Sequence, residues 1–254
     1  MIATPEKVSD WLEHEVDDHD LESFVPVAAG FGRTRFGYVV TPNVDHLVRC
    51  HEEPAFMEYY RAADYVLLDS RFAARVLRIV KGVQFRVCTG SDLTLALFSR
   101  VISPTDRIVL IGGDSEQMLS IQRRFGLRDV RHHTPPMGFI NNPAAVERCV
   151  DFIESNSPFR FCFLAVGSPQ QEALAAQVRA RGRARGLALC VGASLNFITG
   201  IEKRAPVWMQ QLSLEWLYRL SRNPSRMANR YLVRGPRFFG YLRRAKFTRR
   251  SAVT

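Results

Sequence analysis

The sequence predicts an α/β fold, because six short apolar runs alternate with segments of helical periodicity. The runs lack the strict polar and apolar alternation of a half-exposed strand, which indicates strands buried on both faces of a parallel sheet. A hydrophobic content of 46% over 254 residues is enough to fill a large core. We therefore expect a Rossmann-like, mostly parallel sheet flanked by helices.

The expected elements follow in a regular order after an amphipathic N-terminal segment. Strands are expected within residues 36–43, 65–69, 85–90, 107–113, 159–167 and 187–192. Helices are expected at 54–63, 70–81, 91–101, 115–125 and 169–185. In sheets of this kind ligands bind at the carboxyl ends of the strands, so the loops that follow the strands are the expected site.

Positive charge is concentrated at the C-terminal end of the chain. From Lys203 to Thr254 there are 13 Lys or Arg residues and one acidic residue, whereas the remainder holds 22 basic and 24 acidic residues. A local excess of this kind indicates an anionic partner. We interpret residues 1–200 as the α/β body and residues 201–254 as a basic, helical, membrane-contacting appendage.

The appendage is predicted to contain two helices. Pro206 suits a first helical turn, and Asn223-Pro224 is typical of an N-cap followed by a first-turn proline, so a break is expected near Asn223. An apolar stripe at steps of four is formed by Trp208, Leu212, Trp216 and Leu220. A cationic face at steps of three and four is formed by Arg219, Arg222, Arg226, Arg230, Arg234 and Arg237. A solvated face is the ordinary alternative, but the segment holds almost no counter-charges.

Several function classes lose support from composition. The five cysteines form no CxxC pair and have no histidine at metal-ligand spacing, so we expect buried, reduced thiols and no metal. No apolar run approaches the roughly 18 to 20 residues of a membrane-spanning helix, and the acidic N-terminus does not resemble a signal peptide. A soluble protein of the cytoplasm is expected.

Polar side chains at the predicted strand ends are candidates for chemistry. Asp69 ends an apolar run, where a carboxylate can act as a general base if burial raises its pKa; an N-cap of the next helix is an equally good interpretation. Thr41 and Asn43 follow the first strand and could bind sugar hydroxyls, although a structural turn at Pro42 explains them almost as well.

Glycine turns mark three further strand ends. In Gly90-Ser91-Asp92 and Gly112-Gly113-Asp114, backbone amides could meet phosphate or sugar oxygens, or the glycines could only permit tight turns. After Gly167, Gln171 and Glu172 fall in a first helical turn, where they could contact a nucleotide or favour the helix end. Neither the dinucleotide fingerprint nor the P-loop is present.

Together these motifs resemble the WecG/TagA/CpsF glycosyltransferases, family 26, from about Thr41 to Phe239. The most specific part is Lys203-Arg204-Ala205-Pro206, followed by the run 214–220 and an arginine-rich continuation. The other matching positions are Thr41-Pro42-Asn43, Asp69, Gly90-Ser91-Asp92-Leu93, Gly112-Gly113, Gly167-Ser168-Pro169, Gln171-Glu172, Gly192-Ala193, Gly200, Pro224, Arg226 and Arg230-Tyr231.

The resemblance implies an inverting, metal-independent and cofactor-free transferase, which moves a sugar from a UDP-sugar to a saccharide on polyprenyl diphosphate. It makes Asp69 the catalytic base, with Thr41, Asn43 and Asp92 in the pocket. The nucleotide site would comprise Gly90, Gly112, Gly113, Gly167, Gln171 and Glu172. Arg219, Arg226 and Arg230 would complete the active site from the appendage. The enzyme would lie on the inner face of the cytoplasmic membrane, with self-association left open.

Some positions depart from the family pattern. Ser70 and Arg71 follow Asp69 where glycine is common, and Leu195-Asn196 stands where Phe-Asp is common. Ala165 and Gln170 replace a frequent glycine and a basic residue. Because Asp69 is present, we expect an active enzyme with altered sugar specificity. N-acetylmannosamine, its uronic acid, glucose and glucuronic acid all remain open as donor sugars.

Two other function classes are alternatives. A nucleic-acid-binding module would use the basic tail for phosphate contacts. Against it, the apolar residues Phe238, Phe239, Tyr241 and Leu242 accompany the charges as in an interfacial anchor, and no recognition motif is present, so no nucleic acid is expected. A nicotinamide-dependent oxidoreductase is discounted for lack of the glycine fingerprint.

Overall fold

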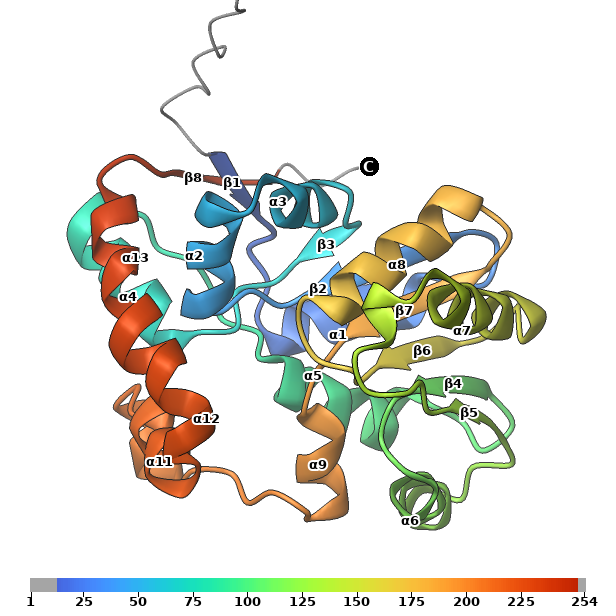
Figure 1. Ribbon diagram of the computed structural model, residues 1–254. Helices are drawn as coiled ribbons and strands as arrows, with labels where there is room; N and C mark the ends of the chain where they lie inside the picture. The colour runs from blue at the N-terminus through green and yellow to red at the C-terminus, as the bar shows by residue number, and fades with distance from the viewer. Residues whose placement is uncertain (1–12, 251–254) are drawn as a thin grey trace, which may run out of the picture.

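A six-stranded parallel sheet forms the centre of the molecule in the computed structural model, which describes residues 13–250 apart from the side chain of residue 226 (Figure 1). The strand order is β3-β2-β7-β6-β4-β5, and every neighbouring pair is parallel. The strands are β2 (Phe36–Val40), β3 (Tyr65–Val66), β4 (Arg107–Ile111), β5 (Asp129–His133), β6 (Phe161–Leu164) and β7 (Gly186–Cys190). The predicted α/β class is confirmed.

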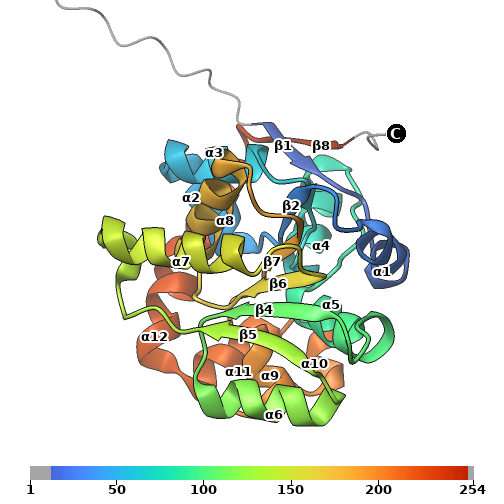
Figure 2. The same ribbon diagram turned by 90° about the vertical axis from the view of Figure 1, so that its right-hand side faces the viewer.

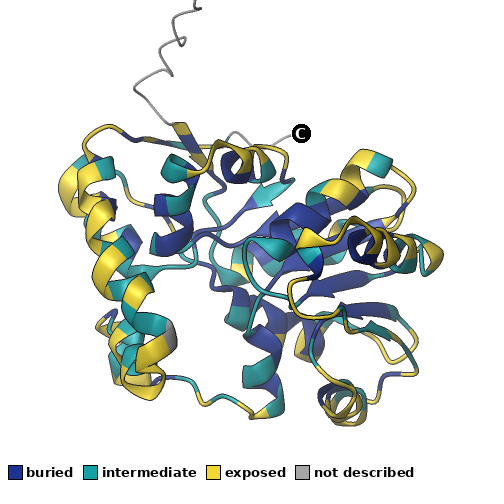
Figure 3. Cartoon of the chain, in the orientation of Figure 1, coloured by how far each residue is buried: buried dark blue, intermediate teal, exposed yellow. Residues whose placement is uncertain are grey.

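Helices cover both faces of this sheet, so its central strands are buried on both sides (Figures 2 and 3). Along β6, Cys162 and Leu164 join the core on one face, while Phe161 and Phe163 join the core on the other. The first core is completed by α2 (Val44–Glu52), α3 (Pro54–Arg61), α7 (Pro143–Ser155) and α8 (Gln170–Arg181). The second is completed by α1 (Leu21–Gly30), α5 (Gly90–Ala96), η1 (Leu97–Val101), α6 (Ser115–Phe125) and α9 (Ser194–Thr199).

Two strand predictions were wrong. Residues 85–90 form no strand. Cys88 N–H does donate to the Leu68 carbonyl at 3.1 Å, next to β3. The ladder does not continue, because the N–H of Arg86 donates to the Asp18 side chain at 2.8 Å instead. The edge strand β5 was missed because its sequence, DVRHH, contains no apolar run. A strand with one neighbour can be polar, since its hydrogen bonds to β4 do not depend on side-chain burial.

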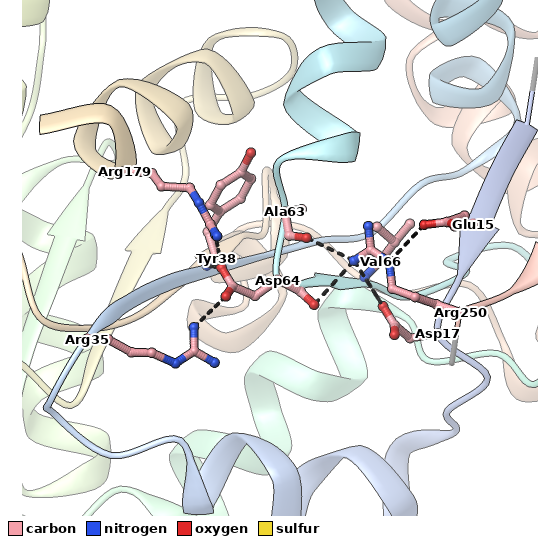
Figure 4. A network of polar contacts seen from close by, with 9 residues as sticks. All are labelled: Glu15, Asp17, Arg35, Tyr38, Ala63, Asp64, Val66, Arg179 and Arg250. Carbon is pink, nitrogen blue, oxygen red and sulfur yellow. Dashed lines mark hydrogen bonds and ion pairs between the residues drawn. The ribbon is translucent and has the colours of Figure 1, made fainter. Parts of the chain in front are cut away.

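A second, two-stranded sheet joins the two ends of the described chain. β1 (Glu13–Val16) pairs in parallel with β8 (Lys246–Arg249), and His14 stacks on Phe247 with ring centroids 4.8 Å apart. Arg250 donates to the carbonyls of Ala63 and Asp64 at 2.9 and 3.3 Å and lies 3.7 Å from the Asp17 carboxylate (Figure 4). The end of the chain is thereby attached to the body.

Over its described residues, 201–250, the basic C-terminal segment contains five helical pieces before β8 instead of the two helices that were predicted. These are α10 (Val207–Gln211), α11 (Glu215–Arg222), α12 (Pro224–Ala228), η3 (Asn229–Arg234) and α13 (Gly235–Leu242). The break at Asn223 is confirmed. The single apolar stripe is wrong, because the chain turns at Ser213, with φ of 64°, and leaves Trp208 and Leu212 more than half exposed.

The segment packs on α2 and on α4 (Arg71–Lys81), which lie beside α13 (Figure 1). Phe238 and Leu242 are fully buried there with Leu47 and Leu77. The interpretation of Phe238 and Leu242 as an interfacial anchor is therefore wrong, because body residues already cover them. Phe239 remains half exposed.

Candidate active site

A cavity of about 240 Å³ lies between the carboxyl edge of the sheet and the C-terminal segment. From the body it is lined by Asn43, Val44, Asp45, Asp69, Ser70, Arg71 and Phe72. From the C-terminal segment it is lined by Ser213, Glu215, Trp216, Arg219, Arg230, Tyr231, Gly235, Pro236 and Phe239. The predicted base and two of the predicted arginines thus face one space.

Asp69 lies just beyond β3, where its N–H donates to the Pro42 carbonyl at 2.8 Å. Burial raises the pKa of its carboxyl to about 7, opposed chiefly by Arg219 and assisted by Glu215. The helix that follows is capped by Ser70, whose Oγ accepts from Ala73 N–H at 3.0 Å. The alternative interpretation of Asp69 as an N-cap is therefore wrong, and its carboxylate is left for the cavity.

Asn43 links the body to the C-terminal segment. Its Oδ1 caps α2 by accepting from the N–H groups of Asp45 and His46 at 3.0 and 3.4 Å, and it also accepts from Arg230 Nη2 at 3.0 Å. Thr41, two residues earlier, is buried, and its Oγ1 is 3.4 Å from the Cys190 carbonyl. Among these two predicted pocket residues, Asn43 lines the cavity with Asp69 and Thr41 does not.

Asp92 forms part of a charged network at the rim of the cavity. Burial alone would raise the pKa of its carboxyl, but hydrogen bonds from Arg204 and Thr89 outweigh it, so the pKa is lowered. Arg71 lies 3.9 Å from Asp92 and 3.7 Å from Glu215, and Arg204 lies 4.0 Å from Glu215. Asp92 therefore binds the C-terminal segment through Arg204 and does not line the cavity itself.

A second cavity, of about 500 Å³, adjoins the first. Its cationic lining residues are Lys203, Arg204, Arg219 and Arg222. Arg219 and Glu215 line both cavities, and the Arg219 guanidinium stacks over Phe197 at 5.4 Å from the ring centroid. With four cations against Glu202 and Glu215, this space suits an anion next to Asp69.

Gln171 and Glu172, at the start of α8, are almost completely buried. Gln171 Nε2 donates to Glu172 Oε1 at 2.9 Å, and Gln171 Oε1 accepts from Gly192 N–H at 2.8 Å. Burial raises the pKa of the Glu172 carboxyl. These side chains tie α8 to the loop after β7, and their contact with a nucleotide stays a prediction.

The predicted glycine turns lie at the same edge of the sheet, after β4 and β6. Gly112 and Gly167 have φ of 95° and 81°, in the left-handed region that favours glycine. A Cβ on Gly112 would lie 2.9 Å from the Ala165 backbone, and Gly113, with φ of 73°, also adopts the left-handed region. Gly90 begins α5, and a Cβ there would lie 3.0 Å from Thr41 Oγ1. Close packing at Gly112 and the left-handed backbone at both positions therefore explain Gly112 and Gly113 without a ligand.

Body residues supply counter-charges to the arginines of the C-terminal segment, contrary to the expectation from the sequence. Asp45 lies 3.5 Å from Arg230 and 3.6 Å from Arg234, and Glu52 lies 2.9 Å from Arg237. Asp45 and Glu52 are seven residues apart on α2, which places them on one helix face. The seven-residue spacing can be read from the sequence. No local pattern, however, indicates that these carboxylates pair with arginines so far along the chain. The side chain of the third predicted arginine, Arg226, lies outside the described part of the structure.

A family model for the glycosyl transferase WecG/TagA/CpsF family matches residues 10–252, nearly the whole chain. The chain belongs to this family. Members of the WecG/TagA/CpsF family are glycosyltransferases of cell-surface polysaccharide biosynthesis, which take a sugar donor and a lipid-linked acceptor. Within residues 13–250, no helix has the length and apolar character needed to cross a bilayer.

Proposed function

We propose that this WecG/TagA/CpsF protein transfers a hexose-type sugar from a UDP-sugar to a saccharide on polyprenyl diphosphate, with inversion and without a metal. The proposal is carried by one observation: Asp69, with a raised pKa, shares a cavity with Arg219 and Arg230 of the C-terminal segment. A base and fixed cations are what a single displacement with an anionic leaving group requires.

In the proposed reaction, the acceptor hydroxyl gives its proton to the Asp69 carboxylate. The hydroxyl oxygen forms a bond to the anomeric carbon of the donor from the face opposite UDP. The bond between that carbon and the UDP oxygen breaks, and its electron pair leaves with UDP. One displacement inverts the anomeric configuration. A pKa near 7 suits a group that must accept a proton at neutral pH.

Arginines would stabilise the leaving group. Charge grows on the diphosphate as the bond to the sugar breaks, so cations already in place lower the barrier most. Arg219 is suited to this because it lies between the cavity of Asp69 and the second, cationic cavity. We assign the diphosphate to that junction, with Arg226 as a further candidate. The nucleoside would extend toward the loops of Gly90, Gly112 and Gly167, and Gln171 and Glu172 would support its binding.

We further propose that residues 201–254 act as an appendage that rests on the inner face of the cytoplasmic membrane. Among the described residues, the exposed large apolar residues of this segment are Ile201, Val207, Trp208, Leu212, Leu217, Leu232, Val233 and Phe239. They accompany an excess of basic groups, the combination that binds anionic bilayers. Flotation with anionic vesicles should recover the protein, while retention on duplex DNA at the same salt concentration would favour the nucleic-acid alternative.

The decisive experiment is turnover with defined substrates. A panel of UDP-sugars is screened by thermal shift, and those that raise the Tm are tested with a short polyprenyl-diphosphate saccharide in the presence of EDTA. A ligand at 100 times its Kd should stabilise the protein by about 2.7 kcal/mol. We expect transfer with inverted configuration for at least one donor. Stabilisation by NAD but by no UDP-sugar, or transfer that requires a metal, would contradict the proposal.

A further inference from the structure

Asp45 is a buried carboxylate that the proposed reaction does not use. It lies in the first turn of α2, is 9% exposed and lines the same cavity as Asp69. Its Oδ1 has no hydrogen-bond partner among the described residues. A buried carboxylate is costly unless a cation lies close, so its neighbours indicate its role.

Those neighbours are two arginines of η3. Arg230 Nε lies 3.5 Å from Asp45 Oδ2, and Arg234 Nη1 lies 3.6 Å from Asp45 Oδ1. The adjacent His46 does not compete, because burial and the nearby Arg230 and Arg49 lower its pKa to about 3 and keep it neutral. Of the two arginines, Arg230 lines the cavity and Arg234 does not.

The Arg230 guanidinium is held at two points by the start of α2. Its Nη2 donates to Asn43 Oδ1 at 3.0 Å, while its Nε faces Asp45. Because the guanidinium is planar and its N–H groups point in fixed directions, two contacts set its orientation. Among the described residues, Asn43 is the only hydrogen-bond partner of the Arg230 side chain, so its remaining N–H groups can meet an anion.

We propose that Asp45 is a positioning residue, which orients Arg230 toward the diphosphate leaving group in the cavity of Asp69. The inference rests on the proposed function. It gives Asp45 a role in the rate of the reaction, since a cation that is already oriented costs no reorganisation when charge develops. A purely structural role is the alternative, because an acidic residue in a first helical turn also favours the helix dipole.

The variant Asp45→Asn keeps the shape of the side chain and removes its charge. We expect kcat to fall about 10-fold to 100-fold, within the range for a displaced transition-state donor, while KM for the UDP-sugar changes less than about threefold. Asp45→Glu should recover part of kcat, since it restores the charge at a slightly different position.

Glu52→Gln is the matched control. Glu52 lies two turns further along α2 and pairs with Arg237 at 2.9 Å in the same contact between α2 and the C-terminal segment, but it does not line the cavity. Loss of the Glu52 charge should lower the Tm only modestly and leave kcat within about twofold. Equal kcat losses in both variants would overturn the inference in favour of a structural role.

A double-mutant cycle with Arg230→Gln completes the test. If Asp45 acts through Arg230, the double variant should lose hardly more kcat than Arg230→Gln alone. Additive losses, or a normal kcat for Asp45→Asn, would overturn the inference while the proposed function stands. Absence of transfer by the wild-type protein would instead overturn the proposed function. Circular dichroism shows whether Asp45→Asn folds, and if it does not, Asp45→Ser removes the charge in its place in the cycle.

Discussion

The two walls of the cavity are built in different ways. On the body side, Asp69 follows a buried strand, and its backbone N–H donates a hydrogen bond to the Pro42 carbonyl at the sheet edge. On the C-terminal side, Arg219 and Arg230 belong to short helical pieces held by ion pairs, aromatic stacking and the β1–β8 pair. The base is positioned by the core of the main sheet, whereas the cations are positioned by ion pairs and by a smaller apolar cluster between α13, α2 and α4.

The difference matters because the two kinds of contact differ in strength. Burial of the two sheet cores accounts for most of the stability, whereas the C-terminal segment is held by a smaller buried cluster and by ion pairs, of which the exposed ones contribute between zero and about 1 kcal/mol each. The C-terminal wall should therefore open at a lower free energy than the body unfolds. Four predictions test this contrast, in order of expected effect.

Replacing one buried phenylalanine by alanine should lower global stability in the body but mainly cause local opening in the C-terminal segment. Phe163→Ala removes a fully buried ring that stacks on Phe98 at 4.7 Å, and it should cost about 3–5 kcal/mol of global unfolding free energy in urea. Phe247→Ala removes the ring stacked on His14 and should mainly expose the C-terminal segment to limited proteolysis. Equal global losses would show that both regions unfold as one unit.

Removal of the base should abolish most turnover without harming the fold. Asp69→Asn is expected to lower kcat about 100-fold or more, because the hydroxyl loses its proton acceptor. Asp106→Asn, which removes a surface partner of Arg33, serves as the control and should keep full turnover. A near-normal rate for Asp69→Asn would remove Asp69 from the mechanism.

Loss of one cation from the other wall should have a smaller effect. Arg219→Gln is expected to lower kcat about 10-fold to 100-fold, since other arginines remain near the leaving group. Arg244→Gln removes an exposed arginine that lines neither cavity, and it should leave turnover of a water-soluble acceptor unchanged. If both variants lose activity equally, turnover depends on the net charge of the C-terminal segment and not on the position of Arg219.

The pKa of Asp69 predicts a dependence of stability on pH. It rises from 3.8 to about 7 on folding, so between these values the folded protein binds more protons than the unfolded chain, and stability falls as pH rises. At roughly 1.4 kcal/mol per pH unit the ceiling is about 4 kcal/mol, and partial solvent access reduces the expected effect to about 1–2 kcal/mol. Asp69→Asn should thus have the higher Tm at pH 8, and the difference between the two Tm values should shrink steadily as the pH is lowered toward 3.8. A variant that is less stable at pH 8 would contradict the assignment.

Local sequence signals were sufficient for most of the body. The apolar runs predicted five of the six sheet strands because burial on both faces leaves a continuous hydrophobic pattern. The polar edge strand β5 carries no such pattern and was missed. The sequence shows Asp69 as a carboxylate at a strand end. Only the hydrogen bond from Ala73 N–H to Ser70 Oγ identifies Ser70, and not Asp69, as the cap of the next helix.

The sequence by itself determined the α/β class, the edge at which polar residues gather, the break at Asn223 and the charge of the C-terminal segment. Only the tertiary structure decided which arginine contacts which side chain of the body. The Arg230 contact joins residues 187 positions apart, to Asn43, and no periodicity relates positions so distant in sequence. Spacing along a chain encodes helices and strands, whereas the pairing of charges depends on how those elements pack.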